Sequence, residues 1–106
     1  MNYFDCKKLK RMMDSQILTV RTLKEEMRSH RGCTGNMSDA IETEEKRLRE
    51  LQRRIFEMIR AIPDAYIRKI MYLKIWRGMT WNRIAVKLGG INSGDGIRKM
   101  CVRYRW

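Results

Sequence analysis

Histidine and proline are almost absent from this sequence, which contains one of each. The single histidine, His30, lies in a glycine-containing stretch, so we do not expect catalysis by histidine as a general acid or base. No Ser, His and Asp set and no pair of carboxylates stands out. With one proline and almost no run of alternating apolar and polar residues, the chain leaves little room for strands. We therefore expect an all-α protein that is not an enzyme and uses no cofactor.

Two ligand-binding motifs are present only as fragments. The stretch GGINSGDG lacks the lysine and the preceding strand of a phosphate-binding loop. His30 and Cys33 form an H-x-x-C fragment, but a zinc site needs a second pair of ligands, so we expect no metal. The three cysteines, Cys6, Cys33 and Cys101, lie far apart and are odd in number, which favours free thiols in a reducing compartment.

Long apolar runs are also missing. No segment approaches the roughly 18 apolar residues of a membrane-spanning helix. The first ten residues, MNYFDCKKLK, have no apolar signal core. We expect a cytoplasmic protein with no membrane partner, and a length of 106 residues is enough for one modest core.

What the sequence has in excess is positive charge. There are 24 Lys and Arg residues against 12 Asp and Glu, a net charge of +12. Residues 64–106 carry 10 of these basic residues and only 2 acidic ones, whereas residues 32–63 carry 6 of each. Such a field attracts polyanions, and double-stranded DNA is the partner that we expect.

Apolar residues recur every three or four positions along the first part of the chain, which is typical of amphipathic helices. We predict helices over Phe4–Ser29 and Ala40–Ile62, separated by the turn-forming stretch His30–Asp39. Two narrow apolar stripes joined by a short loop predict an antiparallel hairpin over residues 1–62. This hairpin is a scaffold, or pairs between chains in a homodimer or higher homo-oligomer through residues 4–62.

Three shorter helices are predicted after Pro63, which ends the second helix. Each has a residue suited to capping its start, since Asp, Thr and Ser side chains accept from free amides there. The expected helices are Ala65–Arg77 opened by Asp64 or Pro63, Trp81–Leu88 capped by Thr80, and Gly94–Tyr104 capped by Ser93.

The last two of these helices have different characters. The first is largely apolar, and its small residue Ala85 lets a crossing helix approach closely. Gly89 can take the left-handed conformation that stops it. The second carries an outward stripe made of Arg98, Lys99, Val102, Arg103 and Arg105. A supporting helix followed by a cationic one predicts a helix-turn-helix unit over residues 63–106, whose last helix enters the major groove of DNA.

A set of residues between Trp76 and Arg98 also follows a known pattern: Trp76, Gly78, Thr80, Trp81, Ile84, Ala85, Leu88, Gly89, Ser93, Ile97 and Arg98. On these residues, the segment 62–104 resembles the helix-turn-helix of sigma-factor region four. It is more closely similar to small phage transcriptional regulators of the ArpU and RinA type. The resemblance implies a DNA-binding regulator of phage or prophage late genes, acting in a bacterial host cell at the nucleoid.

The resemblance also implies roles for single residues. Carried over by position, Asp95, Arg98 and Lys99 face bases, with Val102 and Arg103 expected on the same face. Thr80, Asn82 and Arg83 lie near the DNA backbone, together with Lys87, Ser93 and Arg105. Gly94 and Gly96 stand where the family has side chains, and each costs roughly 1 kcal/mol of helix stability against alanine. We therefore expect the first turn of this helix to be loose without DNA.

Two other functions fit the same composition. A packaging or assembly protein, such as a small terminase-like subunit, would oligomerise through the hairpin and hold DNA without reading it. A sigma-like module would instead bind RNA polymerase, with DNA contacts secondary.

Overall fold

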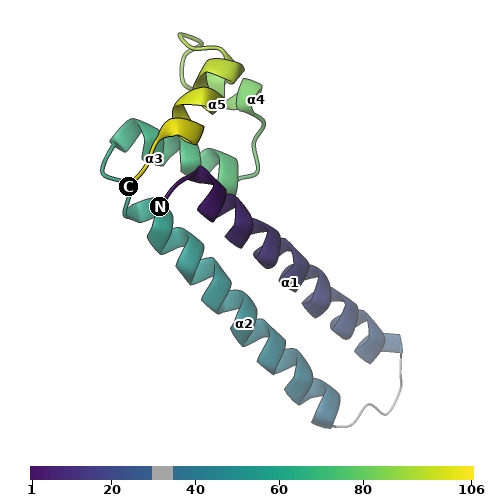
Figure 1. Ribbon diagram of the computed structural model, residues 1–106. Helices are drawn as coiled ribbons and strands as arrows, with labels where there is room; N and C mark the ends of the chain where they lie inside the picture. Colours follow the sequence, from purple (N-terminus) through teal and green to yellow (C-terminus); the bar gives the residue numbers. More distant parts are fainter. Residues whose placement is uncertain (30–34) are drawn as a thin grey trace.

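The computed structural model describes residues 1–29 and 35–106, and they form helices (Figure 1). The elements are α1 (Tyr3–Ser29), α2 (Gly35–Arg60), α3 (Ala65–Met71), the π-helix η1 (Tyr72–Trp76), α4 (Trp81–Lys87) and α5 (Gly94–Arg103). No strand occurs in these described ranges, and the only extended pairing there is an isolated bridge between Asn2 and Arg105. The all-α fold class predicted from the sequence is confirmed.

The two long helices, α1 and α2, lie side by side and run in opposite directions (Figure 1). Their apolar stripes face each other, and the buried residues include Cys6, Met13 and Ile55. Gln16 occupies a polar position within this contact, and its Nε2 donates to the Glu44 carbonyl at 2.8 Å and to the Glu44 carboxylate at 2.6 Å. A polar group inside an apolar stripe is satisfied by a matching partner, so this pair helps to fix the register of the two helices.

The start of α2 differs from the prediction. The helix begins at Gly35, five residues before Ala40, so Ser38 and Asp39 lie inside it and do not cap it. The low helix propensity of this stretch is outweighed by packing, because Met37 is half-buried one turn before the buried Ile41. The remainder of the predicted loop, including His30 and Cys33, lies outside the described residues.

The segment predicted as one helix over Ala65–Arg77 is helical as far as Trp76, but only its first half is an α-helix. Asp64 caps it as expected, since its carboxylate accepts from the Ile67 amide at 3.0 Å. From Tyr72 the backbone widens into the π-helix η1, in which the Arg77 amide donates to the Tyr72 carbonyl at 3.1 Å. π-Helices, whose hydrogen bonds span five residues, are rare in proteins. Those that occur are often found at functional sites.

A single apolar core connects the long helices with the C-terminal elements. It contains Cys6 of α1, Ile55 of α2, Ile70 of α3, Ile84 of α4 and Ile97 of α5. The end of α2 is also bound by the indole of Trp106, whose Nε1 donates to the Met58 carbonyl at 3.1 Å. The division into units 1–62 and 63–106 stays a prediction, because the two segments share this core.

Within the described part of the chain, none of the helices is both long enough and apolar enough to cross a lipid bilayer.

Candidate nucleic-acid interface

Helices α4 and α5 carry the residues predicted to contact DNA, and local hydrogen bonds fix how each begins. Thr80 caps α4 by accepting from the Arg83 amide at 3.3 Å, and Ser93 caps α5 by accepting from the Gly96 amide at 3.1 Å. Between them the chain reverses at Gly89, whose φ of 101° belongs to the left-handed region that favours glycine. The predicted caps and the predicted glycine stop are confirmed.

Gly94 holds the starts of the two helices together. It is buried, and a Cβ added to it would lie 2.1 Å from Asn82 Oδ1 and 2.9 Å from the Asn82 amide nitrogen. No side chain fits between these atoms. The sequence predicted a loose first turn here, whereas the structure has a capped turn packed directly on α4.

The exposed face of α5 carries a compact cluster of charge made of Asp95, Arg98 and Lys99. The Arg98 guanidinium donates to Asp95 Oδ1 at 2.9 and 3.2 Å, and Lys99 Nζ lies 3.0 Å from Asp95 Oδ2. These hydrogen bonds, from Arg98 first and then from Lys99, hold the pKa of the Asp95 carboxyl below its usual value. Because the three side chains are about half exposed (61%, 45% and 54%), the cluster faces solvent.

The remaining residues predicted to contact bases differ in how exposed they are. Arg103 is exposed in the last turn of α5. Val102 is half-buried and packs against the core, which corrects its expected place on the outward stripe. Arg105, expected near the backbone of DNA, lies beyond the end of α5 in the extended bridge with Asn2.

Four of the residues predicted to contact the DNA backbone line two shallow depressions beside α4. Asn82, Arg83 and Lys87 are exposed and line the first, a depression of about 440 Å³. The second, of about 280 Å³, runs between the starts of α4 and α5 and is lined by Thr80, Trp81, Asn82, Gly94, Asp95 and Arg98. This depression brings candidate base contacts and candidate backbone contacts onto one surface.

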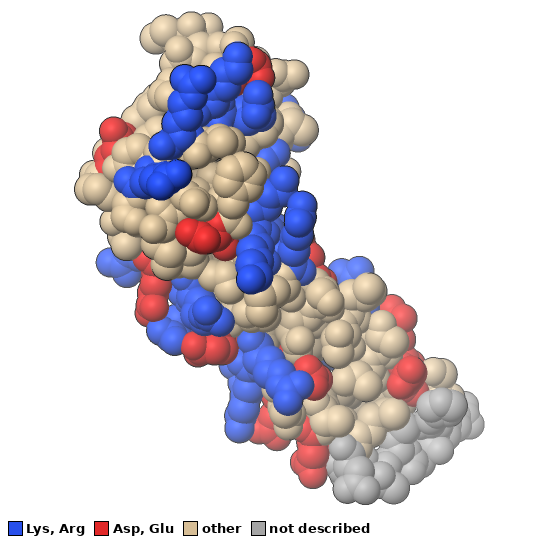
Figure 2. Space-filling view, in the orientation of Figure 1, with Lys and Arg blue, Asp and Glu red and all other residues tan. Residues whose placement is uncertain are grey.

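Acidic neighbours pair with a larger share of the cations of α2 than of the cations of α4 and α5. On α2, Arg47 pairs with Glu44 at 2.9 Å and Arg53 pairs with Glu57 at 2.7 Å. In the described ranges, by contrast, the exposed cations Arg83, Lys87 and Arg103 form no ion pair. Figure 2 shows blue side chains gathered over α5 and over the neighbouring junction with α1, while blue and red alternate along α2.

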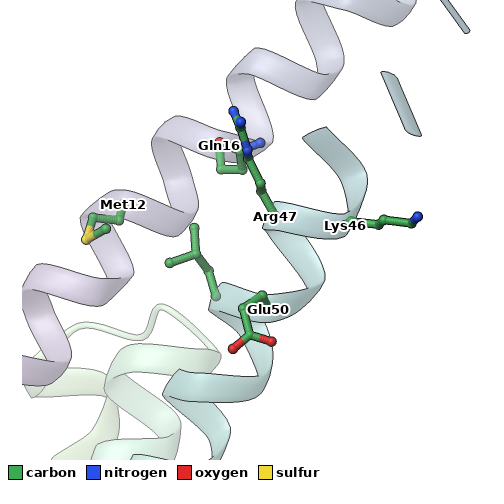
Figure 3. Close-up of a pocket in the computed structure, with 6 residues that line it drawn as sticks. Met12, Gln16, Lys46, Arg47 and Glu50 are labelled. Atoms are coloured by element: carbon green, nitrogen blue, oxygen red, sulfur yellow. The ribbon is translucent and has the colours of Figure 1, made fainter. Parts of the chain in front are cut away.

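Another depression lies between the two long helices (Figure 3). Its volume is about 490 Å³, and it is lined by Met12 and Gln16 of α1 and by Lys46, Arg47, Glu50 and Leu51 of α2; Arg47 extends toward Gln16, whereas Lys46 points away from α1. It brings together none of the predicted site residues. Among the residues that the structure describes, no group of three His, Cys, Asp or Glu side chains could hold a metal ion.

One contact at this surface could not be predicted from the spacing of apolar residues. Lys74 is half-buried on η1, with its ammonium 4.7 Å from the centre of the Trp81 ring. The contact depends on the π-helical turn, which has no signal in the apolar spacing.

Comparisons of the chain with family models, with curated proteins and with solved structures find no significant match.

Proposed function

We propose that this protein is a sequence-specific regulator of transcription that binds double-stranded DNA through α5, without catalysis. The observation that supports it is the solvent-facing cluster of Asp95, Arg98 and Lys99 on a helix that a second helix braces at Gly94. The resemblance to phage regulators of the ArpU and RinA type extends the proposal to late genes of a phage or prophage, at the nucleoid of a bacterial host cell.

In this proposal α5 lies in the major groove, which is about 12 Å wide and admits a helix. Arg98 donates to the O6 and N7 atoms of a guanine, and this bidentate contact is worth about 1–3 kcal/mol of discrimination. Asp95 holds the guanidinium in place before binding, and its free lone pairs suit the amino group of a cytosine. Lys99 and Arg103 extend the contact along the groove.

Backbone contacts come from α4 and the adjacent turns. Lys87 and Arg83, with no acidic neighbour among the described residues, neutralise phosphates and release counterions. Asn82 and Thr80 line the depression between the helix starts, and Ser93 caps α5 beside it; all three fix the register of the protein on the duplex. A cation without an acidic partner in the protein gains more favourable electrostatic energy from a polyanion than a cation that is already paired, as those along α2 are.

The experiment is a selection of bound duplexes from a random pool, repeated at two salt concentrations. A short enriched motif that persists at the higher salt supports a regulator, because specific contacts lose less to salt than phosphate contacts do. Recovery of random sequences at both concentrations contradicts sequence-specific binding.

One observation favours the packaging alternative enough to include it in the test. Met12 of α1 is 46% exposed and lines, together with Leu51 of α2, the depression between the two long helices, and this apolar surface suits a contact between copies. Light scattering separates the two functions: a ring-sized oligomer without sequence preference indicates packaging, and a monomer or dimer with a defined motif indicates regulation. Capture of RNA polymerase in the absence of DNA would indicate the sigma-like module.

A further inference from the structure

Two lysines that are far apart in the sequence lie over contacting aromatic rings beside the start of α4. Lys7 of α1 places its ammonium 5.9 Å from the centre of the Tyr3 ring, and Lys74 of η1 lies 4.7 Å from the centre of the Trp81 ring. The two rings are themselves 5.5 Å apart. Lys7, Lys74 and this pair of contacting rings form what we call the cationic site.

This site has no counterion of its own within the described part of the chain, where neither Lys7 nor Lys74 forms an ion pair. Burial, and secondly the nearby charge of Lys7, lower the pKa of Lys74. The ring faces attract the ammonium groups but carry no net charge. Two like charges brought together and partly removed from water destabilise the free protein, and a bound anion removes that cost.

The site adjoins the proposed DNA interface through Trp81. One part of this residue lies beneath Lys74, and another lines the depression that also contains Asp95 and Arg98. In helix-turn-helix complexes the first helix of the pair crosses the DNA backbone. Trp81 is the first residue of α4, so a strand that crosses there passes the two lysines.

We propose that Lys7 and Lys74 together bind a backbone phosphate of the same duplex that α5 reads. The inference rests on the proposed function and enlarges it, because it makes α1 part of the DNA interface. Lysine suits this role, since its ammonium binds phosphate as a point charge without demanding the planar geometry of a base edge. The site contributes affinity and register to the complex and leaves the sequence preference to α5.

The test measures the affinity of the full chain for a mixed-sequence duplex as a function of salt, in Lys74→Gln and Lys7→Gln. Loss of one phosphate contact lowers the slope of log K against log salt by about 0.9, which corresponds to about eightfold weaker binding at 0.1 M salt. Lys8→Gln is the matched control. Lys8 is an adjacent exposed lysine of α1 that lines a different depression, with Asp5 and Arg54.

The inference is supported if both test variants lower the slope while the control keeps it. It is overturned if Lys8→Gln lowers the slope as much as the others, or if all three variants match the wild type. If circular dichroism shows that Lys74→Gln disturbs the fold, the test depends on Lys7→Gln. If the salt slopes of the variants are unchanged and the sequence preference still depends on Arg98, the phosphate site at Lys7 and Lys74 is rejected but the proposed function is not. If the wild-type chain binds no duplex, the proposed function is rejected as well.

Discussion

Gly94 packs directly on Asn82, so closely that a methyl group on Gly94 would come within 2.1 Å of the Asn82 side chain and 2.9 Å of its backbone nitrogen. This contact sets how the starts of α4 and α5 approach each other. It also sets where Arg98, one turn further along α5, stands relative to Asn82.

Substituting Gly94→Ala tests this packing. The backbone of α4 cannot move aside easily, so we expect a loss of about 1–3 kcal/mol in the free energy of unfolding, the usual cost of overpacking. Urea denaturation followed by circular dichroism measures it.

Gly96→Ala is the matched control, two residues along the same helix. Its added Cβ meets only Ser93 Oγ, at 3.3 Å, and the better helix propensity of alanine offsets a small adjustment of that cap. We expect its stability to stay within about 1 kcal/mol of the wild type. Equal destabilisation by the two substitutions would contradict a specific contact at Gly94.

The buried cysteines should be chemically inert in the folded protein. Cys6 and Cys101 are 0% and 1% exposed, and burial raises their pKa values to about 11 and about 12. The reactive thiolate is therefore scarce near pH 8. In a Cys33→Ser variant, we expect a thiol reagent to label neither cysteine at pH 8 until denaturant is added, after which both react. Rapid labelling of the native variant would show that the core opens readily.

Asp95→Asn should strengthen binding to random DNA. The substitution removes a negative charge that now pairs with Arg98 and Lys99, and it frees both cations for phosphates. We expect tighter binding to random duplex at low salt, with a reduced preference for the selected motif, because the guanidinium is no longer held in place. Fluorescence anisotropy with selected and random duplexes measures both effects. Weaker binding to random duplex would mean that Asp95 supports binding in another way.

Local features of the fold could be predicted from the sequence because their causes are local. The caps Asp64, Thr80 and Ser93 each bond to an amide three residues away, and the turn at Gly89 depends on that glycine alone. The burial of Cys101, in preference to Met100, follows from the final packing of α5, and spacing by itself left both open.

Features that depend on distant residues could not be predicted, because their causes are not local in the sequence. The early start of α2 depends on packing around Ile41, and the π-helix that begins at Tyr72 leaves no mark in the spacing of apolar residues. At the candidate site, the exposed positions of Arg98 and Lys99 could be predicted from helix periodicity. Lys7 and Lys74 lie 67 positions apart, and no spacing rule brings them together.

The central claim is that α5 reads base pairs and that α4 only holds the backbone. The most direct measurement compares Arg98→Ala with Lys87→Ala on the selected duplex, on single-base variants of it and on random duplex. We predict that Arg98→Ala loses about 1–3 kcal/mol of preference at one or two base positions, while Lys87→Ala weakens every duplex equally. An equal loss on selected and random duplexes for both variants would contradict the account.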